Sequence, residues 1–364
     1  MNQPDIGALR VQRNVRLADF TTLGLGGNAK YLVECTNVDH IQAVIKFAQG
    51  EKLPVQVLGS GSNTIFLDEG FEGLVLKIAL RGVHFIRQED DVKMVVAAGE
   101  VWDDFVKLCI SYHLAGVECL SGIPGLVGAT PIQNVGAYGQ EVSDTIVTVK
   151  ALERRTLREE TFSNSDCRFS YRRSRFNYTD VNRFIITEVT FKLKMYGEPE
   201  IQYPELRKHI DSHGDLKKLE AGSQKLTAVR ESVLSLRRKK SMVIDPADPN
   251  SKSVGSFFKN PILSKIEFAA FADRCEEMNI SGNIPTFPAG NAVKIPAAWL
   301  VENAGFKKGY RKGGAGVSAN HTLALVNHGG TTKELLALAE EIQSTVAQRF
   351  GVRLEREPII VQSN

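Results

Sequence analysis

The sequence CLSGIPGLVGATPIQNVGAYGQ, residues 119–140, contains five glycines, two prolines and no charged residue, although charged residues make up 24% of the chain. Prolines and amide side chains interrupt its apolar residues every few positions, which excludes a membrane-spanning helix. Glycine lets a backbone approach another group closely and adopt positive φ. The pattern is therefore typical either of a packed Gly/Pro-rich turn region or of a loop that holds a ligand through backbone amides.

A second glycine-containing loop, LGSGSNT at residues 58–64, follows a segment with strand character. It is not a Walker A loop, because no Gly-Lys-Ser/Thr follows, and it is not a Rossmann fingerprint, because Thr64 stands where the third glycine belongs. Its small residues could form a nest of backbone amides that holds an anion. Taken alone, the loop is most simply a tight hairpin. Together with residues 119–140, it suggests two backbone surfaces that grip one extended ligand with a pyrophosphate, such as FAD.

Composition and charge argue against several classes of protein. The 364 residues are enough for two or three domains, and 45 basic against 42 acidic residues give a net charge of +3, which favours no nucleic-acid partner. The first residues lack the apolar core of a signal peptide. No run of about 18 apolar residues predicts a membrane helix, so we expect no membrane partner.

Cysteines and histidines give no sign of a disulfide framework or a metal site. The five cysteines are odd in number and never form Cys-x-x-Cys, which favours a reducing, cytoplasmic location. His209 and His213 have the spacing of a helical chelate, but no third ligand accompanies them. We therefore expect no metal.

Hydrophobic periodicity in the first half of the chain predicts helices and strands in mixture. Residues 40–50 have the apolar spacing of a helix that ends at Gly50, and residues 101–116 predict a second helix with Gly116 as its C-cap. The first sixteen residues are expected to be disordered or lightly attached. Strands are expected within the segments 54–66, 73–80, 92–100, 145–154 and 183–193, the last two as antiparallel strands.

The second half of the chain continues in the same mixed class. Residues 224–240 predict a helix with a basic last turn. Thr331 and Glu334 have capping-box spacing at the start of the last helix, and Gly351 ends that helix. Residues 352–361 predict a final strand.

Seven segments together resemble one known family. In this order they are TTLGLGGNAKYLVE, VLGSGSNTIF, IPGLVGATPIQNVGAYGQEV, CRFSYRRSRF, GSFFKNP, GGAGVSANHTLALVN and LEREP, and they follow one another as in the UDP-N-acetylenolpyruvoylglucosamine reductases. The resemblance runs from about Leu17 to Ile360, nearly the whole chain. PIQNVGAYG and GSFFKNP are its specific motifs.

The resemblance implies an α+β fold with an FAD-binding region of the vanillyl-alcohol-oxidase (PCMH) type. This region would consist of two α+β subdomains, at residues 17–80 and 81–237, followed by a C-terminal α+β substrate-binding domain at residues 238–351. The strand at 352–361 would return to the first subdomain. A segment of plausible length around Tyr203 assigns the chain to the form of the family that has a tyrosine loop insertion.

The resemblance also implies a reaction, in which NADPH reduces FAD and FAD then reduces the enolpyruvyl ether of UDP-N-acetylglucosamine to a lactyl ether. The product, UDP-N-acetylmuramate, is a peptidoglycan precursor. The family pattern assigns FAD contacts to Gly59, Ser60, Gly61, Ser62, Asn63, Ser121, Gly122, Pro124, Gly125, Gly128, Ala129, Asn134, Gly136, Ala137 and Ile185. We expect a monomer.

Three residues match the catalytic positions of the family. Arg172 would meet the substrate carboxylate, because a guanidinium is always charged and binds a carboxylate in two places. Ser256 would donate a proton to the substrate carbon that becomes a carbanion. Glu357 would assist as an acid or hydrogen-bond partner. Glu355 remains its rival, since residues 353, 355 and 357 would share one face of a strand.

Four residues match the family's substrate contacts. Lys240 would bind the nucleotide phosphates, with Lys239 open as the alternative. Tyr203 would close over the uridine diphosphate, and Tyr138 would face flavin or substrate. Asn260, and with it Lys259, lies near Ser256 in the sequence and is a candidate for a polar contact that stabilises the serine oxygen after its proton leaves. Two other functions remain to be tested against this one, namely a flavin oxidase that uses oxygen and a non-enzymatic nucleotide-binding module.

Overall fold

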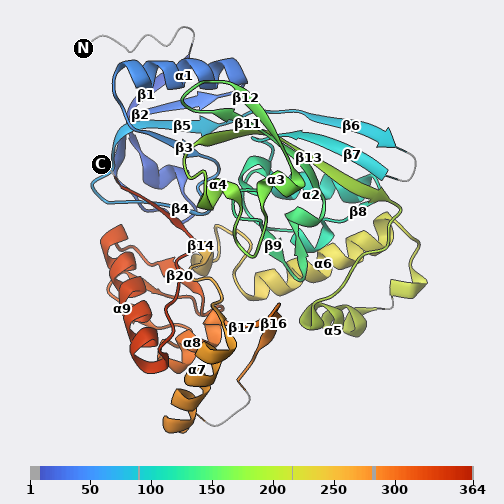
Figure 1. The fold of residues 1–364 in the computed structure, drawn as a ribbon, viewed down its shortest axis with the longest axis vertical. Helices are drawn as coiled ribbons and strands as arrows, with labels where there is room; N and C mark the ends of the chain where they lie inside the picture. The colour runs from blue at the N-terminus through green and yellow to red at the C-terminus, as the bar shows by residue number, and fades with distance from the viewer. Residues whose placement is uncertain (1–8, 89–90, 215, 281–283, 363–364) are drawn as a thin grey trace.

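The computed structural model describes residues 9–88, 91–214, 216–280 and 284–362. The chain is a mixture of α and β structure, as predicted. Two N-terminal sheets lie together, and the C-terminal helices α7, α8 and α9 form a separate part beside them (Figure 1). Within the described residues, no helix is both long enough and apolar enough to cross a membrane.

The first sheet has four strands in the order β1-β2-β5-β3. Their bounds are Val11–Arg16, Asn28–Cys35, Phe71–Ile78 and Val55–Leu58. Strands β2, β5 and β3 are parallel, and helix α1 (Val38–Gly50) follows β2 and packs on the sheet. Both faces of β2 are covered, since its successive residues Leu32 and Val33 point to opposite faces and are fully buried in different hydrophobic clusters.

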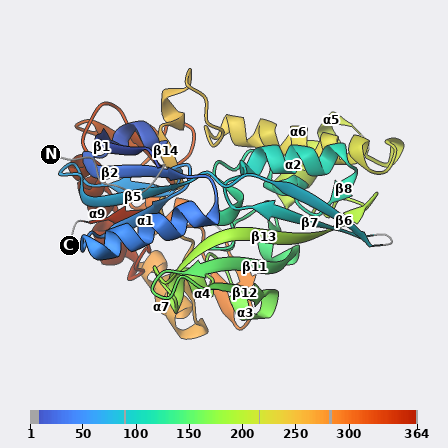
Figure 2. The same ribbon diagram turned by 90° about the horizontal axis from the view of Figure 1, so that it is seen from above.

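The second sheet is antiparallel, with the order β12-β11-β13-β7-β6 and with β8 also paired to β13. In that order the strands are Glu159–Ser163, Ile146–Glu153, Phe184–Met195, Asp91–Ala97, Val83–Gln88 and Leu114–Ala115. The predicted antiparallel pairing of β11 with β13 is confirmed. Helices α2 (Trp102–Ser111) and α6 (Ser223–Lys239) run along one side of the sheet (Figure 2). The short helices are α3 (Asn164–Cys167), α4 (Arg175–Tyr178) and α5 (Pro204–His213).

The C-terminal part has its own hydrophobic core between two small sheets and three helices. The sheets have the orders β14-β20-β19-β18 and β15-β17-β16. The strands are Ser253–Ser256, Ala324–Asn327, Ala315–Val317, Arg311–Lys312, Ile262–Leu263, Ala292–Lys294 and Phe287–Ala289, and the helices are Lys265–Glu277 (α7), Ala297–Asn303 (α8) and Thr332–Phe350 (α9). The predicted capping box of α9 and its end at Gly351, with φ 68°, are both confirmed.

The end of the chain returns to the N-terminal part. Strand β21 (Ile359–Val361) pairs in parallel with β4 (Thr64–Phe66), directly after the loop at 58–64. The prediction of one strand over 352–361 is wrong for its first seven residues, which make only an isolated bridge from Arg356 to Phe258. We propose that the two FAD-binding subdomains comprise residues 17–80 and 81–237 and that the C-terminal domain comprises residues 238–351. Residues 352–361 would return to the first subdomain.

Three local predictions fail for identifiable reasons. Helix α2 ends at Ser111 rather than near Gly116, because His113 takes a positive φ of 59° and β8 then pairs with β13. Strands β3 and β4 do not form a hairpin, because they belong to different sheets. Strand β1 pairs with β2, so residues 11–16 are not loosely attached. Residues 1–8 lie outside the described residues.

Candidate active site

A cavity of about 680 Å³ lies where the two glycine-containing loops face the C-terminal part. One wall consists of residues 59–63 and of residues from the stretch 123–138. The opposite wall includes Ser256, His321 and Glu357. The volume is in the range of sites that bind small molecules and cofactors.

Eighteen of the predicted site residues line this cavity. They are Gly59, Ser60, Gly61, Ser62, Asn63, Pro124, Gly125, Gly128, Ala129, Gly136, Ala137, Tyr138, Arg172, Ile185, Tyr203, Lys240, Ser256 and Glu357. Segments that are far apart in the sequence therefore meet at one place, as the two separate loops and the family motifs predict.

Four predicted residues, Ser121, Gly122, Asn134 and Asn260, do not line the cavity. Each has a partner within the protein. Ser121 donates to a backbone carbonyl 2.6 Å away, and Gly122 donates its N–H to a carboxylate at 2.6 Å. Asn134 donates to a carboxylate at 2.7 Å, and the amide oxygen of Asn260 accepts from a backbone N–H at the start of α8, 2.8 Å away. These residues therefore help to hold the backbone around the cavity in place and do not form part of its lining.

The glycine wall is fixed by close backbone packing. Gly61 has a φ of 70°, and a Cβ at this position would lie 2.0 Å from the carbonyl oxygen of Phe20. Asn63 Nδ2 donates to Gln133 Oε1 at 2.9 Å, and Ser62 Oγ donates to a carbonyl of the other loop at 3.2 Å. The two loops thus form one continuous surface of backbone and small neutral groups. Such a surface fits a large planar cofactor with a pyrophosphate, because backbone N–H groups can approach it closely.

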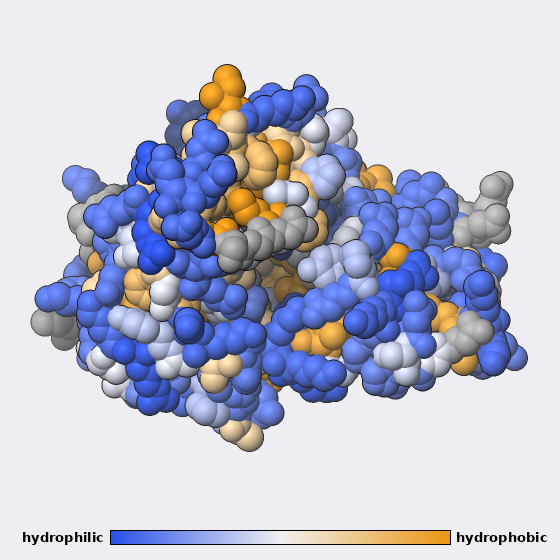
Figure 3. Space-filling model, turned by 90° about the horizontal axis from the view of Figure 1, so that it is seen from below, coloured by the Kyte–Doolittle hydropathy of each residue, from blue (hydrophilic) through white to orange (hydrophobic). Residues whose placement is uncertain are grey.

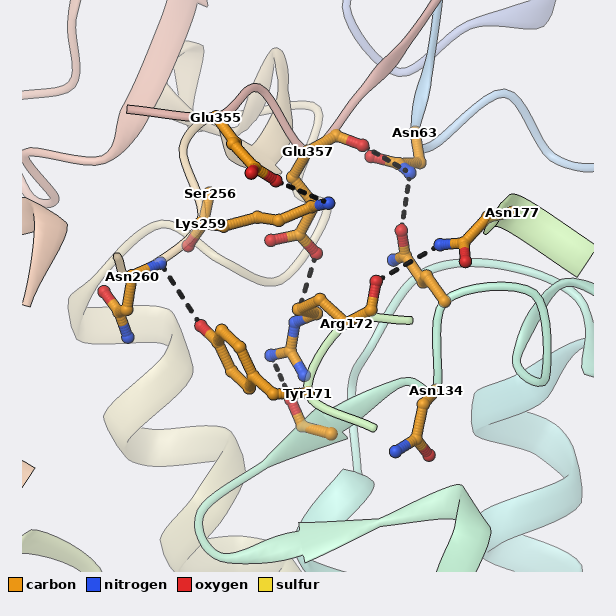
Figure 4. A network of polar contacts seen from close by, with 12 residues as sticks. Asn63, Asn134, Tyr171, Arg172, Asn177, Ser256, Lys259, Asn260, Glu355 and Glu357 are labelled. Atoms are coloured by element: carbon orange, nitrogen blue, oxygen red, sulfur yellow. Dashed lines mark hydrogen bonds and ion pairs between the residues drawn. The ribbon is translucent and has the colours of Figure 1, made fainter. Parts of the chain in front are cut away.

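Arg172 and Glu357 form a shielded ion pair in this cavity, with 3.3 Å between Nε and Oε1 and with side chains only 20% and 13% exposed (Figure 4). Arg172 has a positive φ of 53°, and its Nη2 donates to the carbonyl of Gly136 at 2.6 Å. Burial raises the pKa of Glu357, although the positive charges of Arg172 and Lys259 oppose the shift. The carboxyl group is therefore closer to a proton-carrying form than an exposed glutamate is.

Ser256 ends strand β14, where it lies opposite Ala324 of β20. Gly255 precedes it with a φ of 77°, and the pairing of the two strands is irregular between Ser253 and Ser256. Ser256 lines the cavity, and its Oγ lies 3.5 Å from Nε2 of His321.

The structure separates the pairs of residues that the sequence left open. Glu357 lines the cavity, whereas Glu355 does not; its side chain is 67% exposed and pairs with Lys259. Lys240 lines the cavity and Lys239 does not. The Nζ atom of Lys240 lies 2.8 Å from the carboxylate of Glu205 on α5. Geometry therefore favours Glu357 and Lys240 as the site residues.

Two tyrosines form the end of the cavity beside Lys240. The rings of Tyr138 and Tyr203 meet edge to face with their centroids 5.6 Å apart. Burial, the largest cause, raises the pKa of Tyr138 to about 12, so its hydroxyl keeps its proton and can donate a hydrogen bond.

Sequence reasoning did not assign many other residues of the lining, among them the ionisable residues Arg154, Arg237 and His321. Arg154 and Arg237 are held by backbone carbonyls, at 2.8 and 2.7 Å. The two arginines carry no sequence signal for a ligand site, because arginines after a strand or at a helix end are usually solvated. His321 lies within the family motif GGAGVSANHTLALVN, and this motif was the available signal.

The two histidines with chelate spacing lie side by side on helix α5. The rings of His209 and His213 stack with centroids 4.1 Å apart. The described part of the chain contains no group of three or more potential ligands. All five cysteines are free and buried.

Comparisons with known proteins agree with this architecture. A family model described as UDP-N-acetylenolpyruvoylglucosamine reductase, C-terminal domain, matches residues 246–361, and one described as FAD binding domain matches residues 29–155. A crystal structure of the MurB reductase from Thermus caldophilus has a TM-score of 0.65 and 24% identity, covering 97% of this chain and all of that one, and it supports the fold.

Curated relatives cover nearly the whole chain. The UDP-N-acetylenolpyruvoylglucosamine reductase of Thermobifida fusca is 46% identical over 356 residues, which are 96% of this chain and 97% of that protein. The protein of the same name from Streptomyces coelicolor is 46% identical over 351 residues, 95% of this chain and 88% of the relative. The chain therefore belongs to the UDP-N-acetylenolpyruvoylglucosamine reductase family of FAD-dependent oxidoreductases.

Proposed function

We propose that the protein uses NADPH to reduce the enolpyruvyl ether of UDP-N-acetylglucosamine, giving UDP-N-acetylmuramate. One observation carries the proposal: a guanidinium, a hydroxyl and a buried carboxyl group, those of Arg172, Ser256 and Glu357, line the same cavity as the two neutral glycine loops. FAD, when bound against these loops, would accept hydride from NADPH and pass it to the methylene carbon of the substrate.

Arg172 is the cation for the substrate carboxylate. When hydride adds to the methylene carbon, negative charge develops on the neighbouring carbon and spreads into the carboxylate. A fixed guanidinium close to that carboxylate stabilises this charge more in the transition state than in the ground state. Its hydrogen bond to the Gly136 carbonyl holds the guanidinium in place before the substrate arrives.

Ser256 supplies the proton that completes the reaction. Its hydroxyl faces the cavity, and the carbanion is a base strong enough to accept a proton from it. Glu357, which is paired with Arg172 and has a raised pKa, donates a hydrogen bond or a proton on the same side of the cavity. Tyr138, Tyr203 and Lys240 bind the nucleotide end of the substrate.

An anaerobic colour experiment tests the proposal. The purified yellow protein is reduced with NADPH, and UDP-N-acetylglucosamine enolpyruvate is then added while flavin absorbance is followed. We expect the colour to bleach and then to return, with UDP-N-acetylmuramate as the product. Bleaching without return would rule out the reductase function. Return of colour only with oxygen would indicate an oxidase, and a colourless protein that binds nucleotides would indicate a binding module.

We also propose that the protein acts as a cytoplasmic monomer. One copy of the chain supplies both glycine loops and the side chains of Arg172, Ser256 and Glu357 to the cavity. The face seen from below is mainly hydrophilic, and its hydrophobic residues lie in a hollow, on a protrusion above the hollow and in small separate places (Figure 3). A mainly hydrophilic face is what a monomer should present. Light scattering across a dilution series would give a dimer mass if this is wrong. Fractionation of cells would test the location.

A further inference from the structure

The Ser256 hydroxyl has one hydrogen-bond partner among the described residues, the Nε2 atom of His321 at 3.5 Å. We propose that His321 is a positioning residue for Ser256: its Nε2–H donates to Oγ, which turns the serine proton into the cavity and stabilises the oxygen after that proton leaves. The inference rests on the proposed function and adds a residue to its protonation step.

The backbone holds the two side chains in fixed relation. Ser256 lies opposite Ala324 in the β14–β20 pair, and the next residue, Phe257, donates its N–H to the Leu323 carbonyl at 2.7 Å. The turn that carries His321 is closed by a 3.0 Å hydrogen bond from the Ala324 N–H to the His321 carbonyl. A residue placed by the same strand pair as the proton donor is suited to a geometric task.

The surroundings of His321 keep its ring neutral. Burial lowers its pKa to about 4, and three cations add to the effect: Lys240 and Arg237 at the end of α6, and Lys308 in the segment after α8. Glu302, the carboxylate on α8 next to this turn, accepts a hydrogen bond from the neighbouring Thr322 hydroxyl and does not contribute to the shift at His321. A neutral imidazole has one N–H donor and one acceptor nitrogen, so its tautomer decides which way the serine proton points.

The chemistry selects the Nε2–H tautomer. If Nε2 accepted instead, the serine proton would lie on the Ser256–His321 axis and could not reach the substrate. With Nε2–H as donor, the O–H bond of Ser256 breaks as the new C–H bond of the product forms. The imidazole N–H then faces the negative oxygen, and a proton from water restores the hydroxyl. The ring itself remains neutral throughout.

The other cations in the cavity do not replace this contact. Lys240 and Lys259 both line the cavity, but within the described residues their side chains form ion pairs with Glu205 and Glu355. Neither lysine forms a hydrogen bond with Ser256 Oγ in the described part of the chain. His321 is therefore the group that can act on the serine oxygen in the structure before substrate binds.

Substitutions at His321, followed by stopped-flow measurement of each half-reaction, test the inference. In His321→Leu, we expect flavin reoxidation by UDP-N-acetylglucosamine enolpyruvate to slow by about 10²-fold, as when one donor is removed from a developing anion. Flavin reduction by NADPH should change by less than twofold. In His321→Gln, the amide N–H takes the place of Nε2–H, and we expect recovery to within about tenfold of wild type.

Two double variants separate a role through Ser256 from a general structural role. Replacing His321 by leucine should have no further effect once Ser256 is alanine. In Ser256→Cys, the thiol is a stronger acid and needs less stabilisation, so the effect of losing His321 should fall below tenfold. Equal slowing of both half-reactions, failure of His321→Gln to recover, or a full His321 effect in either double variant would overturn the inference. Loss of substrate-driven reoxidation in the wild type would instead overturn the proposed function.

Discussion

The two walls of the cavity are built in opposite ways. The loops at 59–63 and 123–138 present backbone and uncharged side chains. The rest of the lining presents long or reactive side chains, namely Glu357, Ser256 and His321, together with Arg172, which is held against the glycine wall by the Gly136 carbonyl. The first wall is rigid because backbone packs against backbone, as at Gly61, whereas the second depends on side-chain ion pairs and hydrogen bonds.

The difference suggests a division of labour between holding and reacting. A surface of backbone amides binds a cofactor without introducing groups that could react with it, and its geometry cannot change without a change in the fold. Side chains on the other wall can be altered while the fold persists. Substitutions on the reactive wall should therefore slow chemistry and leave the cofactor bound, whereas those on the glycine wall should cost stability and cofactor together.

The largest effect is expected from Ser256→Ala. Loss of the proton donor should slow flavin reoxidation by substrate by about 10⁴-fold, the upper range for one general acid. Flavin content and reduction by NADPH should stay near wild type, which rapid mixing of each half-reaction measures. Ser253→Ala on the same strand, outside the cavity lining, is the control. Equal loss in both half-reactions would make Ser256 structural and remove the contrast between the walls.

Arg172→Ala should follow, with reoxidation about 10²- to 10³-fold slower because the developing charge loses its cation. Arg172→Lys should recover part of the rate, since a point charge lacks the two-pronged geometry of a guanidinium. The neighbour Arg173 provides a matched control, because it stacks on Tyr178 with 3.9 Å to the ring centroid and does not line the cavity. If Arg173→Ala slows reoxidation as much, the guanidinium is misassigned.

Gly61→Ala tests the other wall. The new Cβ would lie 2.0 Å from the Phe20 carbonyl oxygen, and the alanine would have to keep a φ of 70°. We therefore expect about 3 kcal/mol of destabilisation and loss of bound FAD. Gly50→Ala is the control, since Gly50 ends helix α1 with no atom within 4 Å of a new Cβ. Denaturant unfolding and flavin absorbance measure both. A Gly61→Ala protein that retains FAD but has lost its catalytic rate would contradict the division between the walls.

The same division explains what could be predicted from the sequence. The glycine wall is partly visible in the residues themselves, because two uncharged, glycine-containing segments suggest a backbone surface for a ligand, although each segment alone is equally typical of a packed turn. Helix α9 was equally readable, since Thr331, Glu334 and Gly351 are local signals that act within a few residues. These features need no knowledge of distant parts of the chain.

The reactive wall was predictable only through family resemblance. Its geometry comes from pairings between distant residues, such as β4 with β21, which no local pattern encodes. For that reason Glu357 was assigned to a regular strand that does not exist, and His321 was missed although its motif was noted. The predicted hairpin between β3 and β4 failed in the same way, because each strand found a partner in a different sheet.

The smallest predicted effect concerns the stability contributed by Glu357. Its folded-state pKa is raised, chiefly by burial, so the folded protein holds this proton at higher pH than the unfolded chain does. Stability from this group is present below the unfolded pKa and is lost as pH rises through the folded pKa. Glu357→Gln should therefore match wild type near pH 4 and be more stable at pH 8, as thermal unfolding at the two pH values would measure.

Glu355→Gln is the matched control, because that side chain is 67% exposed and lies outside the cavity. Its unfolding temperature should differ little from wild type at either pH. We further expect Glu357→Gln to slow flavin reoxidation about tenfold or more while it stabilises the fold. A gain in stability joined to a loss of rate is what a buried carboxyl group kept for chemistry should give, since its charge costs stability in the folded state. If Glu357→Gln destabilises the protein at pH 8, the pair with Arg172 is structural, and the two walls are more alike than their residues suggest.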